Sequence, residues 1–203
     1  MNNRLLPLPD TVDPAATAQA CLLVADLVGS TRLARVLPLP HYMALMTDLI
    51  QVLMLHFEAY GGQVLQHQGD ALVCLFSPAQ VPAALRAAQG SHVRAGQLRL
   101  AEWLGQTLRL RVGLALGEVL TGTVGGTFST YGLPVNLARR LCSAAEPGET
   151  LICPSLLPYV PALKLRERAL DGLPGFEELS LAYRVMQGPP TVQKPAEIEM
   201  KTG

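Results

Sequence analysis

The sequence lacks an excess of charge of either sign, because 16 lysine and arginine residues balance 16 aspartate and glutamate residues. Proteins that bind nucleic acid or an anionic membrane surface usually carry a basic surplus. The sequence also lacks a long apolar run, since the stretch around 45–55 is broken by Asp48 and Gln51. We therefore expect no nucleic-acid partner, no membrane partner and no transmembrane span.

Closely spaced cysteines are also absent. The four cysteines form no CxxC pair, which argues against a disulfide framework or a zinc site. Three of them fall in apolar, strand-like runs and one in a helical run, so we expect reduced core residues: Cys21, Cys74, Cys142 and Cys153. The N-terminus carries no signal-peptide h-region. Together these features predict a cytoplasmic protein.

Apolar residues make up 49% of the 203 residues, which is enough for one domain with a sizeable core. A loose, Pro/Ala/Asn-rich stretch at the start and a Pro-rich stretch at the end flank this domain. We expect a flexible N-terminal lead-in over 1–19, a single domain over 20–187 and a disordered tail over 188–203.

Hydrophobic periodicity predicts the secondary structure. Strands are expected at 20–27, 63–67, 71–76, 107–116, 118–124, 149–153, 163–168 and 180–186, and helices at 30–36, 40–60, 79–103, 134–145 and 154–159. The order strand–helix–hairpin–helix–strand is typical of an α/β (α+β) ferredoxin-like sandwich, a mostly antiparallel sheet flanked by helices. The single tryptophan, Trp103, lies on an apolar helix face and is expected in the core.

Two aspartates are the strongest candidates for chemistry. Asp26 ends an apolar run and precedes a Gly-Ser-Thr turn, and Asp70 follows Gly69 in the predicted hairpin turn. A ferredoxin-like order places the first strand beside this hairpin, so the two carboxylates would lie close together. Carboxylate oxygens suit Mg²⁺, and backbone N–H groups at a helix start suit phosphate. The pair therefore predicts a two-metal site for displacement at phosphorus.

Asn136 and Arg140 lie four residues apart in a predicted helix and so share one face. An amide and a guanidinium aimed together suit a ribose and a developing phosphoryl charge. Without other evidence, the simpler interpretation is that Asn136 is a local helix cap and Arg140 a solvated arginine on the helix surface.

Several blocks, in order, resemble the class III nucleotidyl cyclase catalytic domain over about residues 20 to 186. The blocks are 24–31, 61–62 with 69–72, 110–119, 122–125, 135–141, 145–149 and 170–172. A lone Gly-Asp or Gly-Ser-Thr match would be weak evidence for the family, whereas this many matching blocks in order is a specific signal.

The resemblance implies that Asp26 and Asp70 bind two Mg²⁺ or Mn²⁺ ions per site. It also implies that Asn136 orients the ribose and that Arg140 neutralises charge on the α-phosphate. The reaction implied is attack of the ribose 3′-OH on the α-phosphorus, which gives a 3′,5′-cyclic nucleotide and pyrophosphate. The substrate-binding loop implied is Leu27, Val28, Gly29, Ser30 and Thr31.

The resemblance further implies a head-to-tail homodimer with shared active sites. In that family the metals are bound by one subunit, and the Asn/Arg pair comes from the other. The sequence holds one copy of each half-site, so two copies would build two sites.

The two positions that read the base depart from the family's usual residues. Gln66 stands where adenylyl cyclases usually carry lysine, and Ser129 where they carry aspartate or threonine. Guanylyl cyclases usually carry glutamate and cysteine there. An amide and a hydroxyl can each donate or accept. ATP is favoured because Ser129 is closer to threonine than to cysteine, with GTP or a pyrimidine nucleotide as the alternative.

A further departure is Asp171, which stands where the family carries a lysine for the triphosphate. Lys164, Arg166 and Arg168 lie nearby in sequence and could compensate. The alternative hypothesis is therefore a catalytically weak or inactive module for nucleotide binding or dimerisation. A nucleotidyl transferase acting on nucleic acid is a third reading, which the neutral charge balance disfavours.

Overall fold

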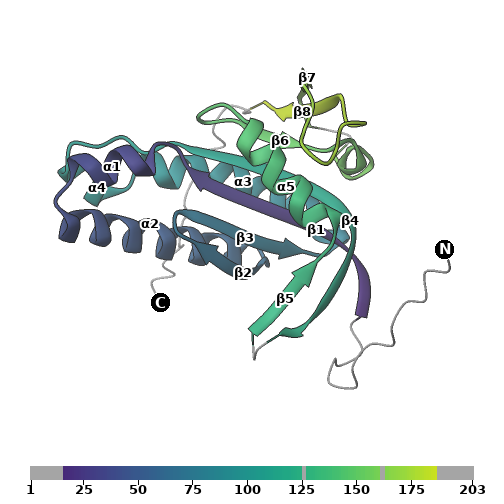
Figure 1. The fold of residues 1–203 in the computed structure, drawn as a ribbon, viewed down its shortest axis with the longest axis horizontal. Helices are drawn as coiled ribbons and strands as arrows, with labels where there is room; N and C mark the ends of the chain where they lie inside the picture. Colours follow the sequence, from purple (N-terminus) through teal and green to yellow (C-terminus); the bar gives the residue numbers. More distant parts are fainter. Residues whose placement is uncertain (1–15, 125–126, 161–162, 187–203) are drawn as a thin grey trace, which may run out of the picture.

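The computed structural model describes residues 16–124, 127–160 and 163–186, and within them an eight-stranded, mostly antiparallel open sheet (Figure 1). The strands lie in the order β2-β3-β1-β4-β6-β8-β7, and β5 pairs with β4. Among the described strands, only β4 and β6 pair in parallel. Their bounds are β1 Ala16–Leu27, β2 Gln63–Gln68, β3 Ala71–Phe76, β4 Leu110–Val124, β5 Thr127–Tyr131, β6 Thr150–Ile152, β7 Leu165–Ala169 and β8 Leu181–Val185.

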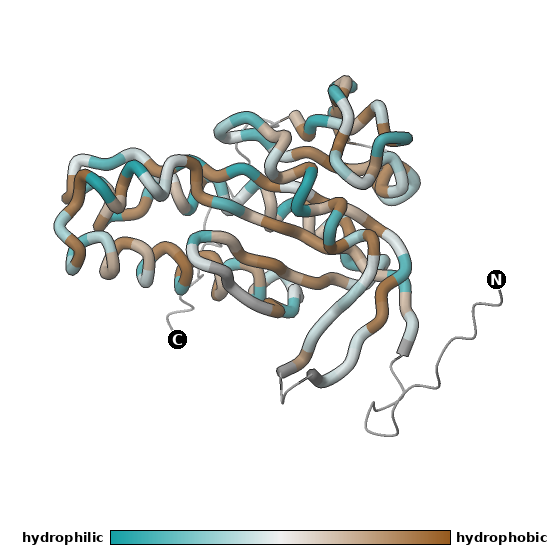
Figure 2. The backbone as a smooth tube through the Cα atoms, in the orientation of Figure 1, coloured by the Kyte–Doolittle hydropathy of each residue, from teal (hydrophilic) through white to brown (hydrophobic). Residues whose placement is uncertain are grey.

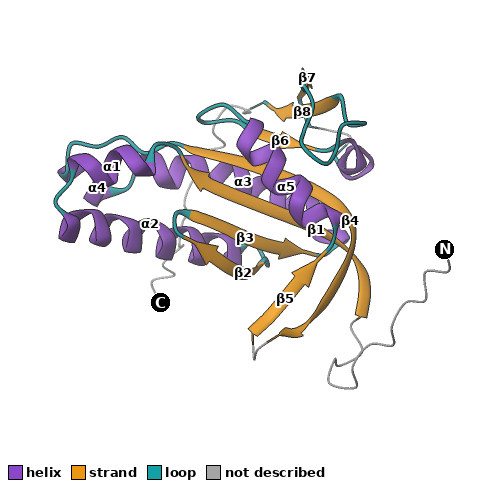
Figure 3. Ribbon diagram, in the orientation of Figure 1, coloured by secondary structure: helices purple, strands orange, loops and turns teal. Residues whose placement is uncertain are grey.

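The first half of the chain forms the ferredoxin-like unit. Its order β1, α2, β2, β3, α3, β4 gives the spatial strand order β2-β3-β1-β4, which confirms the predicted fold class. The α-helices are α1 Ser30–Val36, α2 Leu39–Ala59, α3 Val81–Gly96, α4 Arg99–Trp103 and α5 Leu133–Ala144, and 3-10 turns span Pro78–Gln80 and Pro154–Tyr159. In Figures 1 and 3, α5 lies in front of the sheet and α3 behind it.

The core lies between the sheet and the α2–α3 layer. The buried side chains of α2 recur every four residues, at Leu45, Leu49, Leu53 and Phe57, which is the spacing of one helix face. The central strands appear as the most continuous apolar segments in Figure 2. All six residues from Ala20 to Ala25 are buried, so β1 is covered on both of its faces.

Several predicted elements differ from the observed ones. Strand β1 begins at Ala16, four residues before the predicted start. The strands expected at 107–116 and 118–124 are one strand, β4, which runs through Gly117 without a break. The helix expected over 79–103 is interrupted between α3 and α4.

The sequence analysis also missed β5. Its two aromatic side chains, Phe128 and Tyr131, are exposed, so the strand has no buried face to generate an apolar pattern. Backbone pairing with β4 holds it instead.

The expected core position of Trp103 is wrong. Its side chain is 73% exposed and its ring lies 6.1 Å from the ring of His41. The short helix α4 buries Ala101 instead. The small side chain of Ala101 occupies the core side of this helix, and the tryptophan side chain points outward.

The four cysteines are free and buried, as expected. Burial raises the pKa of the Cys74 thiol to about 12, so it stays protonated and unreactive at neutral pH. None of the described helices combines the length and the hydropathy that a membrane-spanning segment needs.

Acid is expected to destabilise the fold through His92. Its Nε2 lies 2.9 Å from the Thr150 hydroxyl, and burial lowers its pKa from 6.5 to about 4. The unfolded chain therefore takes up this proton at a higher pH than the folded chain. The stabilisation is complete above pH 6.5 and is lost as the pH falls towards 4, by at most about 3 kcal/mol.

Urea unfolding of the wild type and of His92→Gln at pH 7.0 and 4.5 tests this expectation. The wild type should lose more of its free energy of unfolding than the variant. Equal losses in the two proteins would show that His92 does not carry this dependence.

Candidate active site

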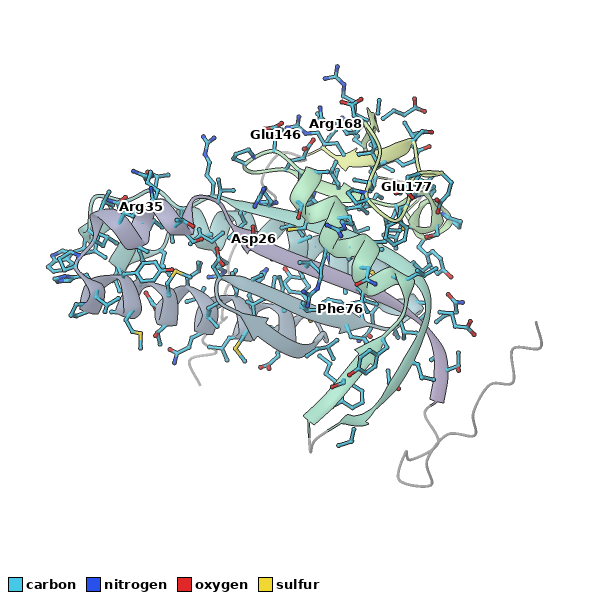
Figure 4. The ribbon with its side chains drawn as sticks, viewed as in Figure 1. Asp26, Arg35, Phe76, Glu146, Arg168 and Glu177 are labelled. Carbon is cyan, nitrogen blue, oxygen red and sulfur yellow. The ribbon has the colours of Figure 1, made fainter. Side chains whose placement is uncertain are left out.

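Strand pairing brings the two predicted metal aspartates to one edge of the sheet. Asp26, near the end of β1, lies opposite Ala71 of β3, and Asp70 directly precedes Ala71 in the hairpin turn. Gly69 enters that turn with a φ of +63°, a conformation that glycine adopts at little cost. Figure 4 shows Asp26 where β1 leads towards α1. The predicted juxtaposition of the two positions is thus present in the fold.

Arg111 also belongs to this site, and the sequence analysis did not single it out. It lies opposite Asp26 on the other neighbouring strand, β4. Its Nη2 donates to Asp26 Oδ2 at 2.6 Å, with both side chains partly buried. The signal that could have found Arg111 is the expected strand order. With β4 beside β1, the pairing places an arginine across from the aspartate. The ion pair neutralises the carboxylate at the position where a cation would bind.

The donor set at this edge fits a hard divalent cation. It consists of two carboxylates and the backbone carbonyls after Asp26, which are oxygen donors. Cys142 lies close by, but burial and the Asp26 carboxylate raise the pKa of its thiol to about 12. No cluster of three or more His, Cys, Asp or Glu side chains forms among the described residues. Oxygen donors of this kind match Mg²⁺ or Mn²⁺ better than zinc.

The loop after Asp26 is fixed by backbone contacts. The Val28 N–H donates to the Arg109 carbonyl at 2.9 Å, and the Leu33 N–H donates to the Gly29 carbonyl at 3.1 Å. Gly29 has a φ of +76° and begins α1. Leu27 is buried, so it can offer a ligand only its backbone, whereas Ser30 is partly exposed and Thr31 exposed.

Helix α5 carries the predicted Asn/Arg pair on the border of two cavities. Asn136 and Arg140 line a cavity of about 500 Å³ together with the segment Pro174, Gly175 and Phe176. Asn136 also lines a second cavity of about 230 Å³ between α5, β5 and the β2–β3 hairpin. The helix thus presents one polar face to two neighbouring spaces.

The smaller cavity contains one of the two predicted base-reading positions. Ser129, on β5, lines it together with Asn136. Gln66 pairs with Val73, which lines the same cavity, but the side chain of Gln66 lies outside the described part of the structure. Neither cavity is lined by Asp26 or Asp70. A single chain therefore does not gather the aspartates and the Asn/Arg pair around one of these cavities.

Comparison with known proteins gives the family. A profile of the adenylate and guanylate cyclase catalytic domain matches residues 12–162. The chain belongs to this family. The fold is similar to that of the adenylyl cyclase CyaB from P. aeruginosa, with a TM-score of 0.81 at 22% identity, covering 87% of this chain and 97% of that one. The guanylyl cyclase Cya2 matches with a TM-score of 0.80 at 17% identity, covering 88% and 97%.

Relatives in sequence include the uncharacterized protein Rv2212 of Mycobacterium tuberculosis, 28% identical over 179 residues. The match covers 87% of this chain and 44% of that protein. The chain thus spans less than half the length of this curated relative.

Asp171, the position at which the resemblance leads us to expect a lysine, is exposed. It lies three residues before the segment that lines the larger cavity. Of the cations that could compensate, Arg168 contacts Glu146 at 3.7 Å, and both side chains are largely exposed (Figure 4). A contact at this distance and exposure is weak, so Arg168 is not firmly held by it.

Close packing sets the position of α5 in this cyclase domain. A Cβ built on Gly113 of β4 would overlap the Ala138 carbonyl oxygen and the Cys142 amide nitrogen. The absence of a side chain therefore lets the helix backbone lie against the strand that carries Arg111. On the same strand, a Cβ on Gly117 would lie 2.8 Å from Pro134.

We expect Gly113→Ala to lower the free energy of unfolding by roughly 1–3 kcal/mol, because the added methyl group forces α5 away from β4. Urea denaturation measures the change. Gly96→Ala is the matched control, since no atom lies within 4 Å of its added Cβ and alanine is the better helix former. Similar destabilisation by the two substitutions would contradict the packing argument.

Proposed function

We propose that the chain is a nucleotidyl cyclase that converts a purine nucleoside triphosphate into a 3′,5′-cyclic nucleotide and pyrophosphate. The ribose 3′-oxygen forms a bond to the α-phosphorus, and the bond from that phosphorus to the α–β bridging oxygen breaks. The hydroxyl proton passes to water and pyrophosphate leaves, so no further reactant is needed.

The observation that carries this proposal is the placement of Asp26 and Asp70. Pairing of β1 with β3 puts the two aspartates at one edge, in a chain of the cyclase family. A bound Mg²⁺ or Mn²⁺ pair there would favour the deprotonated 3′-OH and neutralise the triphosphate. The loop from Leu27 to Thr31 lies next to Asp26. Since the Val28 N–H donates to the Arg109 carbonyl, the N–H groups from Gly29 to Thr31 would be the ones that face the phosphates.

The polar face of α5 supports the remaining roles. Asn136 touches both cavities, which suits a side chain that holds the ribose between the base and the phosphates. Arg140 lines only the larger cavity, where its guanidinium would neutralise the charge that develops on the α-phosphate. These roles depend on positioning and electrostatics rather than on covalent chemistry.

A head-to-tail homodimer with shared sites is the assembly we propose. The aspartates and the Asn/Arg pair do not line the same cavity of one chain. Large apolar side chains are exposed along β4, β5 and the start of α5, which is a surface suited to a partner: Leu120, Phe128, Tyr131 and Leu133. The free, buried cysteines suit a reducing compartment, and we propose a cytoplasmic location.

ATP is the substrate that Ser129 alone would favour, and cyclic AMP would be the product. Solved structures with this fold include a rhodopsin-guanylyl cyclase core with converted specificity in complex with ATPαS and a guanylate cyclase domain in complex with GTP. Proteins with this fold thus bind adenine and guanine nucleotides. We propose that the side chains around the smaller cavity decide which of the two nucleotides this chain prefers. A weak or inactive nucleotide-binding module is the second candidate, which the exposed Asp171 favours.

We expect Asp26→Asn and Asp70→Asn to lower cyclic nucleotide formation by about 100-fold or more, because each removes a charged oxygen ligand. The assay offers Mn²⁺ with ATP, GTP, CTP and UTP separately and detects 3′,5′-cyclic products by mass. Asp48→Asn, on α2, is the control and should keep wild-type activity. Nucleotide binding without product in the wild type would support the inactive module, and full activity of either variant would refute the site.

We expect isolated heterodimers of Asp26→Ala and Arg140→Ala chains to recover up to about half of the wild-type activity, and the unsorted mixture up to about a quarter. Half of the chains pair as heterodimers if mixing is random, and each heterodimer holds one intact site of two. The measurement is product formation after co-expression, with heterodimers isolated through two different affinity tags. No recovery in purified heterodimers would argue against sites shared between subunits.

A further inference from the structure

The smaller cavity contains a charged residue that neither of the two expected base-reading positions supplies. Arg139 lies three residues after Asn136 on α5, so the two share a helix face. Both line the cavity of about 230 Å³, together with Ser129. Arg139 is the one charged side chain among the described residues that line it. We infer that Arg139 is the residue that selects the base and that it favours guanine over adenine.

The shape and chemistry of the cavity suit a base rather than a whole nucleotide. Its volume lies below the usual range for complete small-molecule sites. Apolar side chains from β2, β3 and α5 contribute to its walls, namely Leu65, Val73 and Val135. Such walls suit the faces of a planar ring, and the polar groups of Ser129, Asn136 and Arg139 would meet its edges.

Arg139 is partly buried, whereas its neighbour Arg140 is exposed. Arg139 also borders the larger cavity, so it lies beside Asn136 along the boundary between the two spaces. Partial burial restricts the conformations of the Arg139 side chain, which limits the entropy that would be lost when it binds a ligand. The two adjacent arginines of α5 therefore have different surroundings and need not share a role.

A guanidinium discriminates between purines because it only donates. Guanine presents two neighbouring acceptors, O6 and N7, which accept both arms of an arginine fork. Adenine presents N7 beside an amino group, so one arm would face another donor. Ser129 and Gln66 can each donate or accept and are therefore neutral in this choice. Arg139 therefore changes the expected substrate from ATP, which Ser129 alone suggests, to GTP.

This inference rests on the proposed function, and its test separates the two. Nucleotides that lack the 3′-OH bind but cannot cyclise, so their affinities report base recognition without turnover. We would measure binding of 3′-deoxy-GTP and 3′-deoxy-ATP to the full chain by titration calorimetry with Mn²⁺. The wild type should prefer the guanine nucleotide by about tenfold or more.

Arg139→Gln should bring the two affinities to within about threefold, mainly by weakening 3′-deoxy-GTP. Arg139→Lys should keep part of the preference, because it keeps the charge and loses the fork. Arg86→Gln is the control, as an exposed arginine on α3, and should keep the wild-type ratio. The ratio of kcat/KM for GTP and ATP should follow the same order.

An equal or reversed preference in the wild type would overturn the inference, and so would a ratio that Arg139→Gln leaves unchanged. Equal weakening of both nucleotides would overturn it as well, since that is the signature of a structural or phosphate-binding role. Preference for a cytosine or uracil nucleotide would have the same consequence. Selective guanine binding without any cyclic product would instead refute the proposed function and leave the role of Arg139 intact.

Discussion

The pairing of β1 with both β3 and β4 is the constraint on which the site depends. Antiparallel register places Asp26 opposite Ala71 on one side and opposite Arg111 on the other. A shift of one residue would turn the Asp26 side chain to the other face of the sheet. The buried run from Ala20 to Ala25 makes such a shift costly, because it would draw a flanking polar residue, Gln19 or Asp26, into the buried stretch.

The same pairing explains how a carboxylate is tolerated at the end of a buried strand. Asp26 lies at the boundary where β1 leaves the core, and Arg111 compensates its charge at 2.6 Å. A partly buried ion pair of this kind contributes modestly to stability, since desolvation offsets much of the attraction. Its more important consequence is that the carboxylate is held in place beside the hairpin turn while its charge stays balanced. A divalent cation that binds Asp26 would compete with the Arg111 guanidinium for this carboxylate.

Close backbone packing gives α5 its place. Gly113 lets the helix lie directly on β4, and the helical repeat then sends Asn136, Arg139 and Arg140 to one side. Because two cavities flank that side, neighbouring residues of one helix turn meet different spaces. This division is the physical basis for assigning the ribose, the base and the phosphate to three different side chains. Neither of the two cavities is lined by Asp26 or Asp70, and this is what makes a second copy of the chain part of the proposal.

The sequence by itself determined the ferredoxin-like unit, the burial of the four cysteines and the family. The family followed from the resemblance of several ordered motif blocks. Local periodicity sufficed for the fold and the cysteines, because apolar spacing reports which face of an element is buried, as it does for α2. It missed β5 and misplaced Trp103, since an exposed strand has no buried face and a short helix offers several faces to choose from. Only the tertiary structure decided that Arg111 meets Asp26 and that Arg139 lines a cavity with Ser129. The physical reason is that both contacts join residues distant in the chain through strand order and helix packing, which local pattern does not encode.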